Sequence, residues 1–149
     1  MTSFLIDINV WLAMTWNEHP QHAHASLWYS SINNASLWFC RLTMLGFLRL
    51  LTNSKVMGNS TVTVNEALKL YERWMHDPRV ELVPEPRGME KAFREALIPF
   101  ALQPATKAIA DCYLVGFAEA SGAHLVTFDK GLASSAQARK VPVILIRSV

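Results

Sequence analysis

Short apolar runs alternate with longer amphipathic stretches along the chain. Five runs are typical of buried strands, at 3–6, 35–39, 80–83, 124–128 and 143–146. Helical patterns lie between them, after Asp7, after His19-Pro20, and over 42–51, 63–75, 89–101 and 106–121. Strands that alternate with helices predict an α/β fold with a mostly parallel sheet covered on both faces.

Local signals define several of these helices. Thr63-Val64-Asn65-Glu66 is a capping box, so a helix is expected to start there. Gly122 ends the helix over 106–121 as its left-handed cap, and Pro99 shortens the helix over 89–101. The run Leu42–Leu51 is apolar nearly all round, which predicts a buried helix.

Composition restricts the classes of protein that fit this pattern. A chain of 149 residues with 51% hydrophobic and 17% charged residues predicts one folded domain, 1–149, whose core needs no disulfide. Cys40 and Cys112 lie in apolar surroundings, as in a reduced cytoplasmic protein. No apolar run is long enough to cross a bilayer, and no basic N-terminal region precedes one, so neither a membrane span nor a signal peptide is expected. The net charge of +2 is too small for coating a long duplex.

Two acidic residues follow predicted strands. Asp7 comes after the strand 3–6, and Asp129 comes after the strand 124–128. The carboxyl ends of parallel strands form the edge where open α/β sheets bind ligands, so the two side chains are expected to converge. The alternatives are that Asp7 only caps a helix and that Asp129 is only a turn residue.

A third acid, Asp111, interrupts an apolar helix. A buried lone carboxylate costs several kcal/mol unless it is paired or binds a cation. The alternative is a salt bridge with Lys107, although that order of charges is the weaker one on a helix. Three carboxylates without a surplus of nearby cations repel one another, and Mg²⁺ relieves that repulsion. The chemistry implied is the cleavage of a phosphoryl ester.

Four segments carry a resemblance to a known family. In order along the chain they are Leu5–Val10, Thr43–Leu51, Ala110–Leu114 and Thr127–Leu132. Together they resemble the PIN-domain ribonucleases, and more closely the toxins of VapBC-type toxin–antitoxin pairs. The resemblance implies a three-layer fold with a central parallel sheet of about five strands. It further implies an endoribonuclease that uses Mg²⁺ or Mn²⁺ to hydrolyse RNA, an antitoxin protein as partner, and a homodimer.

The resemblance also assigns roles to residues. Asp7, Asp111 and Asp129 match the acids of the family's metal site, which are its catalytic residues. Asn9 matches a supporting polar residue, and Thr127 is placed to hydrogen-bond the acids. The family usually has Glu where this chain has Met44, and a thioether is a poor ligand for a hard cation.

Other side chains are candidates for contacts with RNA or with a partner. Five cations are candidates for phosphate contact, or else ordinary solvated charges: Arg41, Lys107, Lys130, Arg139 and Lys140. Tryptophans in the first two helices, together with the helix over 63–75, are core by default but also suit an apolar surface for an antitoxin.

Four other readings compete with a PIN-domain nuclease. A phosphatase of the haloacid dehalogenase type needs a second Asp two residues after the first, where this chain has Asn9, and a response-receiver domain needs adjacent acids beside Asp7. The histidines at 19, 22 and 24 lack the spacing of a structural zinc site. The remaining alternative is a catalytically degenerate PIN domain that acts as an RNA- or protein-binding module.

Overall fold

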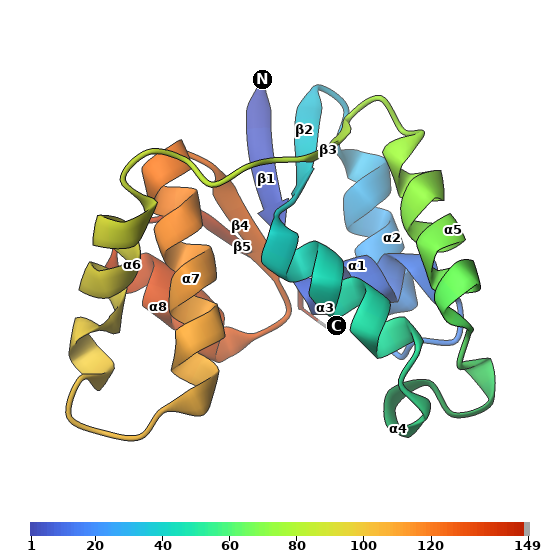
Figure 1. Cartoon of the computed structure of the whole chain (residues 1–149). Helices are drawn as coiled ribbons and strands as arrows, with labels where there is room; N and C mark the ends of the chain where they lie inside the picture. The colour runs from blue at the N-terminus through green and yellow to red at the C-terminus, as the bar shows by residue number, and fades with distance from the viewer. Residues whose placement is uncertain (148–149) are drawn as a thin grey trace.

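A five-stranded parallel sheet forms the centre of the computed structural model, which describes residues 1–147 (Figure 1). The strands are β1 (Thr2–Ile6), β2 (Ala35–Phe39), β3 (Val80–Leu82), β4 (His124–Thr127) and β5 (Val143–Leu145). Their order across the sheet is β3-β2-β1-β4-β5, and every pair is parallel. The predicted parallel α/β sheet is confirmed.

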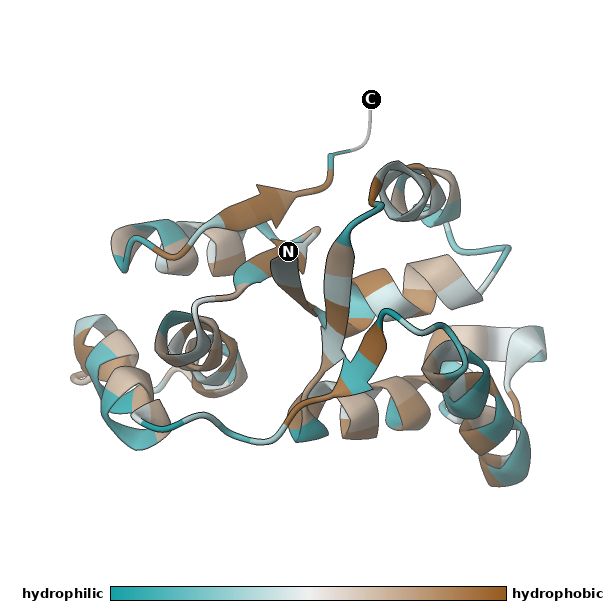
Figure 2. Ribbon diagram, turned by 90° about the horizontal axis from the view of Figure 1, so that it is seen from above, coloured by the Kyte–Doolittle hydropathy of each residue, from teal (hydrophilic) through white to brown (hydrophobic). Residues whose placement is uncertain are grey.

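Helices cover both faces of the sheet and make the three layers that were expected. The helical elements are α1 (Ile8–Thr15), α2 (His22–Ser31), α3 (Arg41–Leu51), α4 (Ser54–Met57), η1 (Gly58–Ser60), α5 (Val64–Met75), α6 (Met89–Leu97), η2 (Ile98–Phe100), α7 (Thr106–Ser121) and α8 (Lys130–Ala138). Viewed from above, α6, α7 and α8 lie on one side of the strands, and α1, α2, α3 and α5 lie on the other (Figure 2).

The alternation of side chains along β1 divides the core into two clusters. Phe4 and Ile6 join the cluster under α1, α2, α3 and α5, whereas Leu5 joins the cluster under α6, α7 and α8. Successive residues of a strand point to opposite faces, so a strand buried on both faces is apolar throughout. This explains the continuous apolar run at the start of the sequence.

Most of the predicted helix boundaries are confirmed. Thr63 and Glu66 form the capping box of α5, with 3.2 Å between the Glu66 backbone nitrogen and Thr63 Oγ1. Gly122 caps α7 with a left-handed φ of 71°. Pro99 lies in the 3-10 turn η2, so α6 ends before it, at Leu97.

Two helical segments were missed. The sequence Asp129-Lys130-Gly131 reads as a turn, but Asp129 instead caps α8, and its Oδ1 accepts from the backbone nitrogens of Gly131 and Leu132. The short elements α4 and η1 were also not predicted. They are too brief to show a helical period, which needs a window of several turns.

The strand order places β1 and β4 side by side, although most of the sequence lies between them. Connections after β1 run toward β2 and β3, while β4 and β5 lie on the other side of β1. The crevice at such a reversal of strand order is where open α/β sheets bind ligands. The backbone nitrogen of Asp7 donates to the carbonyl of Val126 at 2.9 Å, so the two strand ends are joined directly.

The longest helix in residues 1–147, α7, begins near this edge of the sheet, where Lys107 pairs with Asp129, and packs against α6. Within residues 1–147 no helix has the length and apolar character needed to cross a bilayer.

Gly116 brings α6 and α7 close together: a Cβ atom there would lie 2.7 Å from the backbone nitrogen of Phe93. The rigid backbone of α6 therefore fixes how α7 presents Asp111.

Replacing Gly116 with Ala should destabilise the fold. Helix propensity alone favours Ala by about 1 kcal/mol, but the clash with the α6 backbone forces a shift that costs about 1–3 kcal/mol. We expect a net loss of unfolding free energy in urea denaturation. Asn65→Ala, at an exposed position of α5, is the control and should stay within about 0.5 kcal/mol. A Gly116→Ala protein more stable than wild type would show that the helices are not in close contact.

Candidate active site

Asp7 is buried at the carboxyl end of β1 and is held from two sides. Its Oδ1 accepts a 2.8 Å hydrogen bond from the backbone nitrogen of Ile8, as the cap of α1. Its Oδ2 accepts from the Thr127 hydroxyl at 2.8 Å. Thr127 is fully buried at the end of β4, and its Oγ1 also accepts from the backbone nitrogen of Asp129 at 3.0 Å. Thr127 therefore connects the two acids that follow β1 and β4.

Asp129 is balanced by a cation from another element. Its Oδ2 forms an ion pair with Lys107 at the start of α7. Burial tends to raise the pKa of Asp129, but this ion pair and the backbone donors of α8 outweigh it and lower the pKa. The alternative salt bridge of Lys107 with Asp111 is therefore not the one formed. The expectation that no nearby cation offsets the three acids was also wrong, because Lys107 does so.

Asp111 lies on α7 and faces the same cavity as Asp7. The cavity has a volume of about 310 Å³ and is lined by both carboxylates, by Asn9, and by residues of α3. No hydrogen bond to the Asp111 side chain is present within the described residues 1–147. The structure thus brings together two predicted acids, and Asn9 beside them, in one concave site.

Charge repulsion and burial act on these carboxylates. Burial raises the pKa of Asp111 to about 6, the neighbouring charges of Asp129 and Asp7 add to this, and Lys107 only partly offsets it. Burial also raises the pKa of Asp7, against the lowering effect of its hydrogen bonds to Thr127 and Ile8. A site that destabilises its own carboxylate anions is suited to a bound cation.

The donor set fits a hard divalent ion held by two protein ligands. Within residues 1–147 no three His, Cys, Asp or Glu side chains are grouped tightly enough to surround an ion. Mg²⁺, however, is commonly held by one or two carboxylates, with water and phosphate oxygens completing its shell. Asp7 and Asp111 supply those two, whereas the second oxygen of Asp129 is engaged by Lys107.

The face of α3 that lines the cavity differs from the expected one. Leu42, Gly46 and Arg49 lie at helical spacing on α3 and line the cavity, and Asn53, which caps α4, lines it as well. Met44 lies on the opposite side of the helix and packs against the core beneath α1 and α5. The expectation that Met44 occupies a ligand position beside the acids is therefore not met.

Arg49 and Asn53 were not predicted as site residues. Arg49 is exposed at its outer end and brings a guanidinium to a cavity that contains two carboxylates. A usable signal existed for Arg49, which follows Gly46 by three residues and therefore falls on the face of α3 that approaches Asp7. Asn53 follows α3 and caps α4, an element that was not predicted.

Three of the other predicted cations are exposed: Arg41, Lys130 and Lys140. Arg41 is exposed at the start of α3, where its guanidinium contacts the Met44 sulfur. Lys130 is exposed at the first position of α8, and Lys140 follows that helix with a left-handed φ of 59°.

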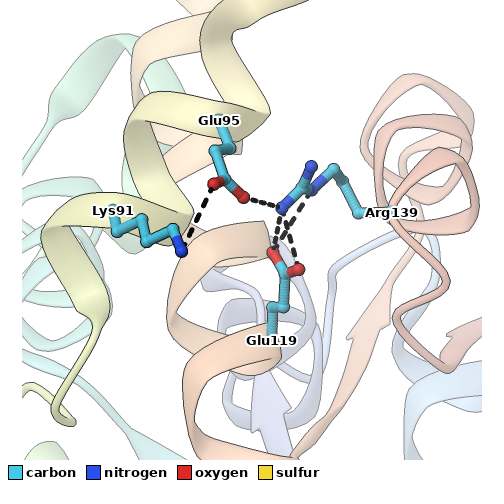
Figure 3. A network of polar contacts seen from close by, with 4 residues as sticks. All are labelled: Lys91, Glu95, Glu119 and Arg139. Carbon is cyan, nitrogen blue, oxygen red and sulfur yellow. Dashed lines mark hydrogen bonds and ion pairs between the residues drawn. The ribbon is translucent and has the colours of Figure 1, made fainter.

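Arg139 belongs to a separate ionic network (Figure 3). Its guanidinium binds Glu95 and Glu119, each at 2.8 Å, and Lys91 lies 4.0 Å from Glu95. Glu119 is two helical turns along α7 from Asp111, which is about 12 Å. Arg139 therefore ties α8 to α6 and α7, and its charge is already balanced away from the acid cavity.

Comparisons with known proteins agree with this geometry. The family model described as PIN domain matches residues 4–137. Ribonuclease VapC41 of Mycobacterium tuberculosis is 38% identical over 132 residues, which cover 84% of this chain and 88% of the relative. Ribonuclease VapC39 of the same organism is 29% identical over 148 residues, covering 94% and 98%.

Solved structures show the same fold. The M. tuberculosis toxin VapC20, described as cleaving the sarcin-ricin loop, has a TM-score of 0.66 at 13% identity and covers 89% of this chain and 94% of its own. VapBC2 from Rickettsia felis, bound to a promoter DNA fragment, has a TM-score of 0.66 at 12% identity, covering 98% and 100%. This chain belongs to the PIN-domain family, and within that family its curated relatives are the ribonucleases named VapC.

Neutralising Asp111 should stabilise the metal-free protein at high pH. A folded-state pKa of about 6 lies above the ordinary 3.8, so the fold favours the protonated carboxyl, and stability is lost as pH rises from about 4 through 6. In chelator at pH 8, Asp111→Asn should therefore raise the unfolding free energy by about 1–2 kcal/mol, after discounting for partial solvation.

The measurement is urea denaturation of both proteins in EDTA at two pH values. One, pH 4.5, is close to the ordinary carboxyl pKa of about 4, and the other, pH 8, is well above the folded-state pKa of about 6. The difference in unfolding free energy between the two proteins should be small at pH 4.5 and large at pH 8. A variant less stable than wild type at pH 8 would show that Asp111 is a stabilising structural acid.

Proposed function

We propose that the chain, as one domain over 1–149, is a metal-dependent endoribonuclease and the toxin of a type II toxin–antitoxin pair. The observation that carries the proposal is the convergence of Asp7 and Asp111 on one cavity at the point where the strand order reverses. The identity of 38% to a protein named Ribonuclease VapC41 supports RNA as the substrate.

In this proposal Asp7 and Asp111 hold Mg²⁺ or Mn²⁺, and Asp129 acts beside them. The bound ion supplies charge stabilisation at the phosphate and lowers the pKa of an attacking water. Thr127 fixes the orientation of Asp7 by donating to Oδ2, so that the carboxylate faces the cavity. Asn9 and Arg49 offer an amide and a guanidinium to the oxygens of the phosphate.

Lys107 has a positioning role in the same scheme. It holds Asp129 against the start of α7 and keeps a positive charge at the mouth of the site, where an RNA phosphate approaches. Its side chain is 69% exposed, so its ammonium group can exchange Asp129 for a phosphate oxygen.

We further propose an antitoxin protein as partner, a homodimer as the assembly and the cytoplasm as location. Solved relatives described as VapBC complexes support the partner. Exposed apolar side chains on α2 and α5, namely Leu27, Val64 and Leu68, offer surface for a protein contact. Trp11 of α1, in contrast, is fully buried, so this tryptophan belongs to the core.

A second candidate function is a catalytically degenerate PIN domain that binds RNA or protein. The observation that favours it is the face of α3, which presents Leu42 and Gly46 to the cavity and no carboxylate. Such a protein would bind its ligand without cleaving it.

Cleavage of a labelled single-stranded RNA separates the two candidates. Wild type should cleave with Mg²⁺ or Mn²⁺ and should stop when EDTA is added. Asp111→Asn should lower the rate by about 100-fold or more, because loss of even an outer partner of a metal ligand costs 10–100-fold. The control is Glu72→Gln, which removes an exposed carboxylate from α5 and should cleave as wild type does.

The contrary results are distinct. Cleavage by Asp111→Asn at the wild-type rate would exclude the acid cavity as the site. RNA binding by wild type without cleavage in either metal would establish the binding module instead.

A further inference from the structure

A second and larger cavity lies beside α8, at the same edge of the sheet as the acids. We name it the α8 groove; its polar lining is Gln21, Lys130, Ser134, Gln137 and Arg147, and Phe128 adds an aromatic ring. Its volume is about 580 Å³, compared with about 310 Å³ for the acid cavity. Ala133, Leu145 and Ile146 form its apolar floor.

Resting on the proposed function, we propose that the α8 groove binds the stretch of single-stranded RNA next to the phosphate that is cleaved. It would thereby contribute to the choice of cleavage site. Three properties of the groove carry this inference: its charge, the type of its polar groups, and its continuity with the acid site.

The groove is positively charged. Lys130 and Arg147 are exposed, and within the described residues neither takes part in an ion pair. Among residues 1–147 no acidic side chain lines the groove. Arg139, at the C-terminal end of α8, is by contrast held by two glutamates. Unpaired cations around a concave surface are typical of sites that track a phosphate backbone.

The remaining polar groups suit bases. Phe128 packs against the core in part and also lines the groove, and stacking of bases on aromatic side chains is a common means of binding single strands. Gln21, Ser134 and Gln137 add amide and hydroxyl groups that donate to and accept from base edges. Lys130, Ser134 and Gln137 lie at intervals of three and four residues, so a single face of α8 presents them together.

The groove lies close to the acids. Phe128 and Lys130 line it and are the chain neighbours of Asp129, about 3.8 Å away between Cα atoms. Thr127 hydrogen-bonds both the Asp129 backbone and Asp7, which lines the acid cavity, so one strand of RNA with a phosphate at the acids can extend into the groove. An acidic peptide is a weaker fit, because it would leave the aromatic face of Phe128 without a stacking partner.

The test measures RNA binding apart from cleavage. The full chain with Asp111→Asn, which keeps RNA intact, is titrated in EDTA against a fluorescein-labelled single-stranded RNA of mixed sequence and about 12 nucleotides, a length within the span of single-strand binding sites. Fluorescence anisotropy at several salt concentrations gives the Kd and its salt dependence.

Removing the two groove cations should weaken binding in a charge-specific way. The pair Lys130→Ala with Arg147→Ala should raise Kd about tenfold, and should make the slope of log K against log salt shallower by about 1.4, or 0.7 for each lost phosphate contact. The matched control is Lys69→Ala on α5, an exposed lysine outside the groove, which should leave Kd within about twofold. Phe128→Leu, with an unchanged melting temperature, should raise Kd about fivefold or more.

The outcomes separate the groove from the nuclease. If the groove variants bind RNA as the Lys69→Ala control does, the inference is overturned, and it is equally overturned if they lose affinity only for a partner protein. If wild type cleaves RNA and the groove variants keep its KM, the groove is excluded while the nuclease stands. If the variants lose RNA affinity but wild type cleaves nothing, the groove stands as an RNA-binding surface, and both the nuclease and a part of the groove in choosing a cleavage site are excluded.

Discussion

The buried hydrogen bond from Thr127 to Asp7 fixes the relation between β1 and β4, and the candidate site depends on it. Both residues are at the carboxyl ends of their strands, and Thr127 is fully buried. Because the chain reverses its direction across the sheet at this pair of strands, side chains from the two halves meet there. The topology of the sheet therefore brings the carboxylates together at one edge, and they repel one another there before any ligand is bound.

The three acids are stabilised by different means. Asp7 accepts hydrogen bonds from Thr127 and from the backbone of Ile8, and Asp129 has the ion pair with Lys107 and the start of α8. Asp111 has neither, so nothing but the nearby charge of Lys107 opposes the effect of burial, which raises its pKa to about 6. This difference explains why a bound cation would stabilise Asp7 and Asp111 most, while Asp129 is already balanced by Lys107.

The sequence predicted correctly the features that depend on a local pattern of residues. The continuous apolar run of β1, the capping box of α5 and the cap Gly122 are local signals, and each was placed correctly. Asp7 and Asp111 were found because a carboxylate after a buried strand and a carboxylate in an apolar helix both need a reason.

The features that the sequence did not reveal depend on three-dimensional neighbours. Lys107 is four residues from Asp111 but pairs with Asp129, which is 22 residues away, because the end of β4 lies beside the start of α7. Met44 matched a family position by its place in a motif, yet the rotation of α3 turns Leu42, Gly46 and Arg49 to the cavity. Both errors arise because a linear motif does not specify which face of a helix meets another element.

The central claim is that Asp7 and Asp111 form a divalent-cation site whose carboxylates are partly protonated when it is empty. Calorimetric titration of wild type with Mn²⁺, in buffers of different ionisation enthalpy, measures the protons released on binding. The account predicts release of a substantial fraction of a proton near pH 6, where Asp111 is half protonated, and much less at pH 8. Asp111→Asn should bind weakly and release fewer protons. Binding of Mn²⁺ with no proton release at pH 6, or with wild-type affinity in Asp111→Asn, would contradict it.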